Sequence, residues 1–180
     1  MTNKPTDKTV SNKLLTLAAG IAVLAAADQL TKVWAVRALK DAPHVLIDGV
    51  LEFCYLENHG AAFGVFQGAR SFFLIITVAF LIAASCVFCR IPSTRRMVWL
   101  RLTLILMTGG AVGNFIDRMR FGYVRDFIYF SLIDFPIFNV ADICVTTSAI
   151  LLAFLVLFVY KENDLAFLSR KRDVDKTTNE

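Results

Sequence analysis

Charged residues are scarce in this chain: they make up 19% of its 180 residues, whereas 57% are hydrophobic. Soluble domains typically carry about 25% charged residues, so this composition excludes an ordinary soluble enzyme. The apolar content, with sixteen phenylalanines, also excludes an intrinsically disordered chain, because disordered segments are poor in apolar residues. The composition therefore predicts an integral membrane protein with a single compact domain.

Several motifs that mark catalytic or metal sites are absent as well. The chain has two histidines and no HExxH pattern, which argues against a zinc protease, and it has no GxSxG serine motif and no P-loop. Its four cysteines form no zinc pattern. Cys86 and Cys89 lie inside an apolar run, so we interpret them as small buried apolar residues. We expect no metal and no cofactor.

The basic residues are arranged differently from those of a nucleic-acid-binding protein. The net charge is +4, but lysine and arginine stand in short clusters between apolar stretches. Such clusters are typical of topology signals that face anionic lipid. We therefore expect membrane lipid, and no nucleic acid, as a partner.

Four apolar stretches are long enough to cross a membrane, which requires about 20 residues per helix. They are Leu14–Val36, Ser71–Cys89, Val98–Ile116 and Val140–Tyr160. The first has an alternative interpretation as a cleavable signal peptide, because three lysines precede it and its apolar core ends at the alanines 25–27. We favour a span because apolar residues resume after Lys32. The intact mass of the mature chain distinguishes the two.

Lysine and arginine are distributed unevenly between the two sides of these spans. The N-terminal segment, the loop 90–96 and the tail hold eleven of them, and the two loops on the other side hold seven. The positive-inside rule then predicts that both termini are cytoplasmic. We expect a cytoplasmic segment at 1–12, a transmembrane domain at 13–160 with outward loops 37–70 and 117–139, and a polar cytoplasmic tail without chemistry at 161–180.

The two outward loops hold most of the polar residues and some structure of their own. Asp48 and Gly49 stand between two β-prone apolar runs, which is a strong hairpin signal. The second loop is rich in aromatic residues, as expected for a segment at the membrane interface. The predicted fold is therefore an all-α membrane protein with four transmembrane helices and a small β-hairpin or sheet in the first outward loop.

Ionisable residues within membrane spans are costly and often functional. Asp28 and Lys32 are one helical turn apart at the outer end of the first span, where a structural ion pair is the alternative to a functional role. At the end of the third span, Gly109 and Gly113 form a GxxxG step that favours close helix packing. A polar ladder accompanies it on what we expect to be one helix face: Gly110, Asn114, Asp117 and Arg118.

Two carboxylates near the outer surface are candidates for catalysis. Asn139 and Asp142 open the fourth span, where a helix cap and capping box are the structural alternative. Asp126 lies in an apolar, aromatic segment that offers an acid no obvious benefit. A water-activating pair needs one ionised carboxyl to accept a proton and one protonated carboxyl to donate one. Asp126 and Asp142 meet that requirement if the fold brings them together.

Five blocks of residues closely resemble the lipoprotein signal peptidase family, also called signal peptidase II. In chain order they are residues 28–32 (DQLTK), 57–64 (ENHGAAFG), 109–118 (GGAVGNFIDR), 122–127 (GYVRDF) and 138–142 (FNVAD). Each block alone is weak, but the five occur in order on a four-helix topology and cover most of the chain.

This resemblance implies an intramembrane aspartyl endopeptidase with Asp126 and Asp142 as its catalytic pair. Such an enzyme removes signal peptides from prolipoproteins by cutting on the N-terminal side of a cysteine that carries diacylglyceryl. The resemblance also implies nine substrate-binding or supporting residues: Asp28, Lys32, Asn58, Gly60, Gly110, Asn114, Arg118, Asn139 and Ala141. Arg125 stands where the family often has an apolar or small residue, and we interpret it as a surface cation.

The alternative is a non-enzymatic membrane module, such as a transporter subunit or an assembly scaffold. Transporters usually place polar groups near the membrane midplane, often within repeats, whereas this chain has no internal repeat and concentrates its polar residues toward one interface. For an enzyme, we expect diacylglyceryl-modified prolipoproteins as substrates, a monomer, and a multi-pass position in the bacterial inner membrane with the active site at its outer face.

Overall fold

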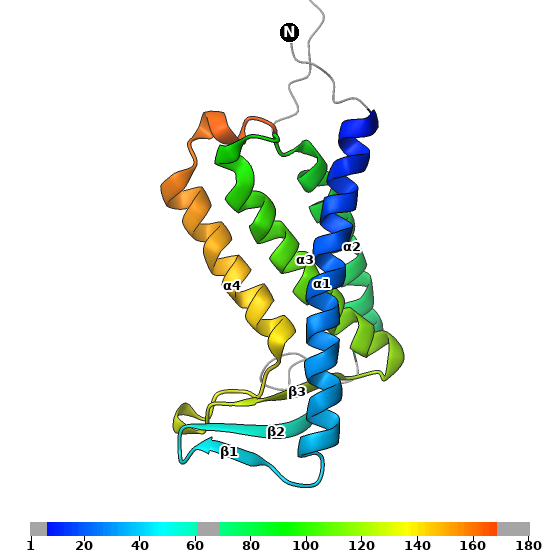
Figure 1. Cartoon of the computed structure of the whole chain (residues 1–180), viewed down its shortest axis with the longest axis vertical. Helices are drawn as coiled ribbons and strands as arrows, with labels where there is room; N and C mark the ends of the chain where they lie inside the picture. Colours follow the sequence, from blue (N-terminus) through cyan, green and yellow to red (C-terminus); the bar gives the residue numbers. More distant parts are fainter. Residues whose placement is uncertain (1–6, 61–68, 169–180) are drawn as a thin grey trace, which may run out of the picture.

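The computed structural model describes residues 7–60 and 69–168 of the chain. Parts of the expected terminal segments, and residues 61–64 of the second resemblance block, lie outside the described residues. Four long helices and a small sheet make up the described fold, and Figure 1 shows the sheet at one end of the helices. The helices are α1 (Asp7–Leu39), α2 (Arg70–Arg90), α3 (Val98–Arg120) and α4 (Val140–Phe154), with a π-helical turn at Leu155–Val159.

The four predicted spans are confirmed as helices that are long and apolar enough to cross a membrane. Many large apolar side chains on their outer faces are exposed, among them Leu15, Ile75 and Leu157, as expected for surfaces that contact lipid. Cys86 also lies on an exposed part of α2, so its interpretation as a buried residue is wrong. The free thiols of Cys86 and Cys89 form no disulfide.

Helix α3 is longer than the apolar pattern predicted. It continues to Arg120, so that Asp117 and Arg118 belong to the helix and not to the second outward loop as expected. The helical structure extends beyond the apolar run because the backbone carbonyls of Asp117 and Arg118 still accept bonds from Phe121 and Gly122. Helix α1 is also longer than predicted and runs without a break through the alanines 25–27.

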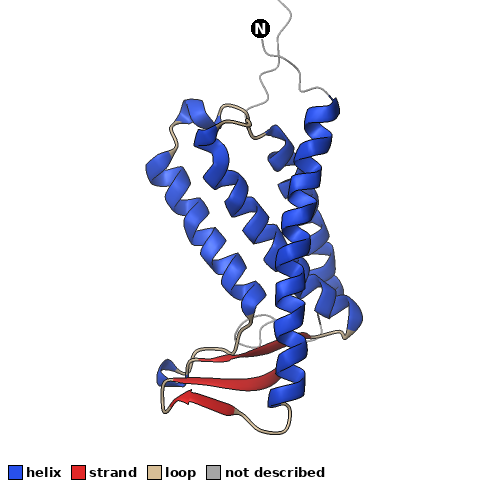
Figure 2. Ribbon diagram, viewed as in Figure 1, coloured by secondary structure: helices blue, strands red, loops and turns tan. Residues whose placement is uncertain are grey.

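The predicted hairpin is present, and it belongs to a larger sheet (Figure 2). Strands β1 (His44–Ile47) and β2 (Leu51–Asn58) are antiparallel and joined by a turn in which Gly49 has a φ of +66°, a conformation that favours glycine. A third strand, β3 (Val124–Tyr129), pairs antiparallel with β2. This strand from the second outward loop was not predicted, and it carries Asp126 in the middle of the sheet's edge.

The GxxxG step packs α3 closely against α1, as predicted. A Cβ added at Gly109 would lie 2.6 Å from a carbon of Leu24, and one at Gly113 would lie 2.5 Å from Oδ2 of Asp28. On another face of α3, a Cβ at Gly110 would lie 2.5 Å from the carbonyl oxygen of Ala141 in α4. Glycine therefore lets α3 approach both neighbours.

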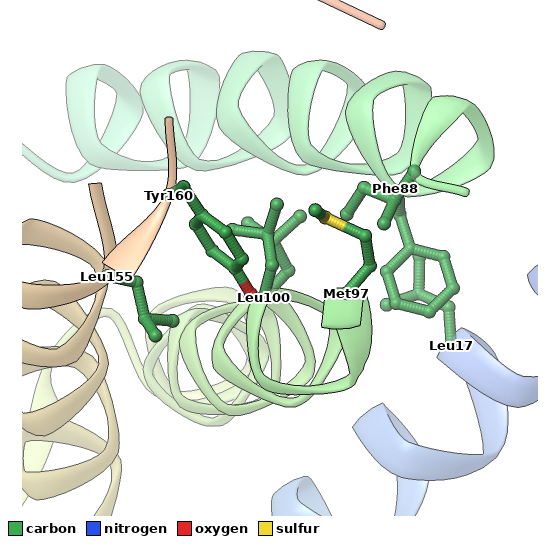
Figure 3. Packing of buried hydrophobic residues seen from close by; sticks show 8 residues of the cluster. Leu17, Phe88, Met97, Leu100, Leu155 and Tyr160 are labelled. Atoms are coloured by element: carbon green, nitrogen blue, oxygen red, sulfur yellow. The ribbon is translucent and has the colours of Figure 1, made fainter. Parts of the chain in front are cut away.

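The main apolar core lies at the end of the helices away from the sheet. Figure 3 shows eight of its residues, which include Leu17, Phe88, Leu100 and Tyr160. At the same end, Arg96 pairs with Asp164 at 2.7 Å and connects the start of α3 to the segment after α4. The first residues of the tail, up to residue 168, are therefore structured. The opposite end of the bundle, next to the sheet, holds the polar residues of the candidate site.

Candidate active site

A cavity of about 680 Å³ lies where the sheet meets the ends of α3 and α4. Apart from Thr146 and Thr147 of α4, its polar lining is formed by six residues from β2, the segment after β2, β3, α3 and α4. They are Asn58, Gly60, Asn114, Arg118, Asp126 and Asp142. All six are among the residues that the sequence analysis selected, and Asp126 and Asp142 lie in the same wall.

Asp126 comes from β3 and is buried, with 1% of its surface exposed. Each of its carboxyl oxygens accepts a hydrogen bond from an asparagine amide. Asn139 Nδ2 donates to Oδ1 at 2.6 Å, and Asn58 Nδ2 donates to Oδ2 at 2.8 Å. The two asparagines hold the carboxyl from α4 and β2 without giving it a counter-charge.

Asp142 comes from the first turn of α4 and takes part in a capping box. The backbone N–H of Asp142 donates to Oδ1 of Asn139, and the backbone N–H of Asn139 donates to Oδ2 of Asp142, both at 3.0 Å. Its other carboxyl oxygen accepts a bond from Asn114 Nδ2 at 2.7 Å. The predicted cap is therefore confirmed, and the capping acid also lines the cavity, so the cap does not exclude a catalytic role for Asp142.

Two asparagines connect the carboxyls to each other. Asn139 is fully buried, and besides its bond to Asp126 its amide also donates to Oδ1 of Asn114 at 3.1 Å. Asn114 in turn holds Asp142. Hydrogen bonds through the side chains of these two asparagines therefore connect β3, the start of α4 and α3 at the cavity.

The electrostatics of Asp126 favour a carboxyl that holds a proton near neutral pH. Burial, and to a smaller extent the nearby carboxyl of Asp142, raise its pKa to about 7, against the opposing effects of the hydrogen bonds from Asn58 and Asn139 and the charge of Lys32. Within the described parts of the chain, neither carboxyl forms an ion pair within 4 Å. The pair is therefore free of a salt bridge that would keep both members ionised.

The predicted ion pair of Asp28 and Lys32 is present and completely buried, at 2.9 Å. Lys32 also donates to Oδ1 of Asn114 at 2.8 Å, and Asp28 accepts the backbone N–H of Ala141 at 3.0 Å. Neither residue lines the cavity. Both act one layer behind it, on the residue that holds Asp142 and on the first turn of α4.

Asn58, Gly60 and Arg118 form the polar corner of the cavity beside Asp126. Gly60 donates its backbone N–H to Oδ1 of Asn58 at 3.0 Å, and its carbonyl accepts a bond from Arg118 at 3.1 Å. The guanidinium of Arg118 also lies 4.6 Å from the centre of the Phe73 ring. The backbone of Gly60 is thus held between the two side chains.

Gly110 and Ala141 contribute to the packing of the site and do not line the cavity. Both are buried, and they face each other at the contact between α3 and α4. A larger residue at either position would push apart the two helices that carry Asn114 and Asp142.

The polar ladder expected on one face of α3 is divided between two faces. Asn114 and Arg118 line the cavity, whereas Asp117 points away from it and is fully buried. Successive helix residues differ in direction by about 100°, so Asp117 and Arg118 cannot share a face. Asp117 instead accepts bonds from Gln29 of α1 and Arg125 of β3, at 2.9 and 2.6 Å.

Arg125 is buried, and its interpretation as a surface cation is wrong. Only 5% of its surface is exposed, because its guanidinium pairs with Asp117 and its stem lies between β3 and α3. Sequence reasoning missed Asp117, Gln29 and Arg125 as a group. All three lie within the resemblance blocks, at residues 28–32, 109–118 and 122–127, which was the available signal.

The apolar part of the cavity wall was not predicted in detail. It is formed by side chains from β2, β3, the start of α4 and the segment between β3 and α4. They are Leu51, Phe53, Val124, Ile128, Phe130, Phe135, Pro136, Ile137, Phe138 and Ile143. A cavity lined by two carboxyls and by many apolar groups suits a substrate that has both a polar backbone and a hydrocarbon part.

The sequence is similar to a known family of membrane peptidases over most of its length. Residues 20–158 match the family described as Signal peptidase (SPase) II. The lipoprotein signal peptidase of Streptococcus pyogenes serotype M5 (strain Manfredo) is 40% identical over 144 residues, which cover 79% of this chain and 91% of the relative. That of Streptococcus thermophilus (strain CNRZ 1066) is 39% identical over 145 residues, covering 80% and 92%.

The fold is similar to solved structures as well. A bacterial membrane enzyme determined by the in meso method at 2.3 Å resolution superposes with a TM-score of 0.69 at 30% identity, covering 89% of this chain and 94% of the other. A second structure of that description, at 1.9 Å resolution, has a TM-score of 0.69 at 33% identity and covers 81% and 94%.

Proposed function

Because the chain belongs to the signal peptidase II family, we propose that it is a lipoprotein signal peptidase that cuts prolipoproteins with Asp126 and Asp142 as an aspartyl pair. The observation that carries the aspartyl assignment is the shared cavity wall. Two carboxyls from β3 and α4 line it, each bonded to neutral amides and neither paired with a cation among the described residues.

The chemistry follows from one proton shared by the two carboxyls. The ionised member takes a proton from water while the water oxygen attacks the scissile carbonyl carbon, and the protonated member donates its proton to the carbonyl oxygen. Collapse of the resulting diol breaks the C–N bond, and the leaving nitrogen receives a proton from the pair. We assign the proton to the pair as a unit, because strongly coupled carboxyls titrate together.

The remaining residues support this reaction in three ways. Three asparagines orient the carboxyls, because their side-chain amides donate hydrogen bonds of 2.6 to 2.8 Å to them: Asn58, Asn114 and Asn139. The corner of Gly60 and Arg118 is suited to hold the substrate backbone, while Asp28 and Lys32 stabilise the wall from behind. Gly110 and Ala141 allow the close contact of α3 and α4.

The substrate proposed is a prolipoprotein whose cysteine carries diacylglyceryl, cut on the N-terminal side of that cysteine. The apolar wall of the cavity offers a surface for hydrocarbon next to the carboxyls. The hairpin of β1 and β2 and the aromatic segment between β3 and α4 would enclose the peptide from the side of the sheet.

The proposal includes an orientation in the membrane. Residues 13–160 form the peptidase domain, both termini are cytoplasmic, and the sheet and cavity face the outer surface of the bacterial inner membrane, where water and the lipidated substrate meet. We propose that the enzyme works as a monomer.

A turnover assay tests the proposal. Purified protein in lipid vesicles is expected to cleave a diacylglyceryl-modified precursor and to leave the same precursor without lipid essentially uncut. Asp126→Asn and Asp142→Asn are expected to abolish the cleavage. Equal cleavage of both precursors would contradict the proposed substrate, and active Asn variants would contradict the aspartyl pair.

A further inference from the structure

Arg125 occupies an unusual position for a cation, immediately before Asp126 in β3 and away from solvent. Its side chain donates twice to Asp117, from a terminal nitrogen to Oδ1 at 2.6 Å and from Nε to Oδ2 at 3.2 Å. Its backbone N–H donates to the same Oδ2 at 3.0 Å. Gln29 accepts a further bond at 2.9 Å, and the guanidinium lies 4.6 Å from the centre of the Phe121 ring.

Arg125 completes a buried ion cluster, which we define as Asp28, Lys32, Asp117 and Arg125. Lys32 lies 2.9 Å from Asp28 and 3.4 Å from Asp117, and Arg125 lies 2.6 Å from Asp117. Two acids and two bases give the cluster no net charge. Without Arg125, Lys32 alone would face both acids, and the cluster would carry one negative charge in a buried place where charge is costly.

The buried ion cluster is linked to both members of the aspartyl pair through neighbouring residues. Arg125 is the neighbour of Asp126 in the same strand. Lys32 bonds to Asn114, which holds Asp142, and Asp28 bonds to the backbone of Ala141 in the first turn of α4. A change in the charge of the cluster therefore acts on the pair through a buried region, where solvent screens it weakly.

We propose that Arg125 is a positioning residue for the aspartyl pair: by neutralising Asp117 it keeps the buried ion cluster uncharged, and by the same bonds it holds β3 against α3. This inference rests on the proposed function of Asp126 and Asp142. In this role, Arg125 sets the pH at which the aspartyl pair loses its shared proton.

Charged groups from α3, α1 and β2 surround the aspartyl pair. Asp117 and Arg118 belong to α3, and Asp28 and Lys32 belong to α1. From β2, Glu57 is the partner of Arg125 in the sheet register, and it accepts a bond from Tyr55 at 3.2 Å. Since Glu57 is exposed to solvent, its charge is screened more than those of the buried ion cluster.

The proposal predicts shifts of opposite sign for the two partners. Arg125→Met leaves the cluster with a net negative charge, so the pair keeps its proton to higher pH, and the fall of kcat/KM on the alkaline side moves up. Asp117→Asn leaves a net positive charge and moves the same fall down. Each shift is expected to be about 0.6 to 1.2 pH units, the size for unit charges roughly 10 Å apart at an effective dielectric constant of about 20 to 40.

The double variant Arg125→Met with Asp117→Asn removes both charges and is expected to return the alkaline fall to the wild-type pH. Arg125→Lys keeps the charge but loses the two-point bond to Asp117. It is expected to keep the wild-type profile while lowering thermal stability. Arg120→Gln is the matched control, because Arg120 also lies over the Phe121 ring, at 5.2 Å, but is exposed at the end of α3. Its profile is expected to match the wild type.

The experiment measures kcat/KM against pH for the purified full chain in lipid vesicles, with a diacylglyceryl-modified precursor. Shifts of opposite sign that cancel in the double variant support the proposal. If Arg125→Met lowers activity or stability with an unmoved profile, Arg125 is only a brace and the proposal is overturned. If Arg125→Met cannot be purified, Asp117→Asn and the double variant decide it in the same way. Activity in Asp126→Asn would instead overturn the proposed function, so the two failures are distinguishable.

Discussion

Asn139 donates its side-chain N–H to Oδ1 of Asp126 at 2.6 Å, from the start of α4 to the middle of β3. The same residue caps α4 through its bonds with Asp142. A single asparagine thus orients one carboxyl directly and begins the helix that carries the other. The stability of α4 and the geometry of the site therefore both depend on the side chain of Asn139.

Replacing Asn139 is therefore expected to have two effects that can be separated. Asn139→Ala removes both the cap, at a cost of about 1 kcal/mol in unfolding free energy, and the bond to Asp126. Asn139→Ser retains a good capping residue but lacks the amide that reaches Asp126. We expect thermal unfolding of the serine variant near that of the wild type, with cleavage of the lipidated precursor reduced in both variants. Full activity of Asn139→Ser would show that the bond to Asp126 is dispensable.

Asp126→Asn and Asp142→Asn are each expected to reduce turnover by at least about 10²-fold, the lower range for loss of a general acid or base. The double variant is expected to be hardly worse than either single one, because the two residues act as a unit. Asparagine keeps the shape of each side chain, so the variants are expected to fold and insert. The measurement is cleavage of a lipidated precursor by each purified variant.

Asp134→Asn serves as the control for these two substitutions. Asp134 lies in the segment between β3 and α4, outside the cavity wall, and accepts a bond from the Tyr129 hydroxyl at 2.7 Å. Its φ is +49°, a left-handed conformation that asparagine also tolerates. We expect near-wild-type turnover, and a loss as large as that of Asp126→Asn would undermine the assignment of the pair.

The pH dependence of cleavage is expected to follow the shared proton. Burial and the neighbouring Asp142 raise the pKa of Asp126 to about 7, so above that pH the pair loses the proton that it must donate. kcat/KM is therefore expected to fall as pH rises through about 7. A profile that stays flat to pH 9 would contradict an essential proton on this carboxyl.

Gly60→Val is expected to lower activity while leaving the protein folded and inserted. Gly60 lies in the cavity wall with its N–H bonded to Asn58 and its carbonyl bonded to Arg118, so a branched side chain would intrude on the space beside Asp126. Gly60→Ala should give a smaller loss because it adds a single methyl group. The measurements are turnover and recovery from the membrane fraction, and full activity of the valine variant would place this residue outside the substrate's path.

The orientation in the membrane is testable with reporters at two positions. The excess of lysine and arginine at the termini and in the loop 90–96 predicts that a fusion after Glu180 behaves as internal. A reporter inserted after Gly49 is expected to behave as external, and the hairpin turn is a suitable place because no atom lies within 4 Å of an added Cβ. An external C-terminus would overturn the arrangement proposed for the active site.

Local signals in the sequence were sufficient for most of the helical fold. Apolar runs predicted the four spans because a membrane helix must be apolar along its whole length. The Asp48–Gly49 turn and the Asn139 cap were also predictable, since each depends on the conformational preferences of a few neighbouring residues. The candidate catalytic pair required more, and the family resemblance supplied it.

Only the tertiary structure decided the environment of the charged residues. Arg125 sits one residue from Asp126 in the sequence, but its partners Gln29 and Asp117 belong to α1 and α3, and Gln29 is 96 positions away. The strand β3 likewise depends on pairing with β2. Burial and pairing of this kind arise from contacts between distant segments, which local patterns do not encode. The sequence by itself determined which residues could do the chemistry, and the packing of β3 against α1 and α3 decided which charges surround them.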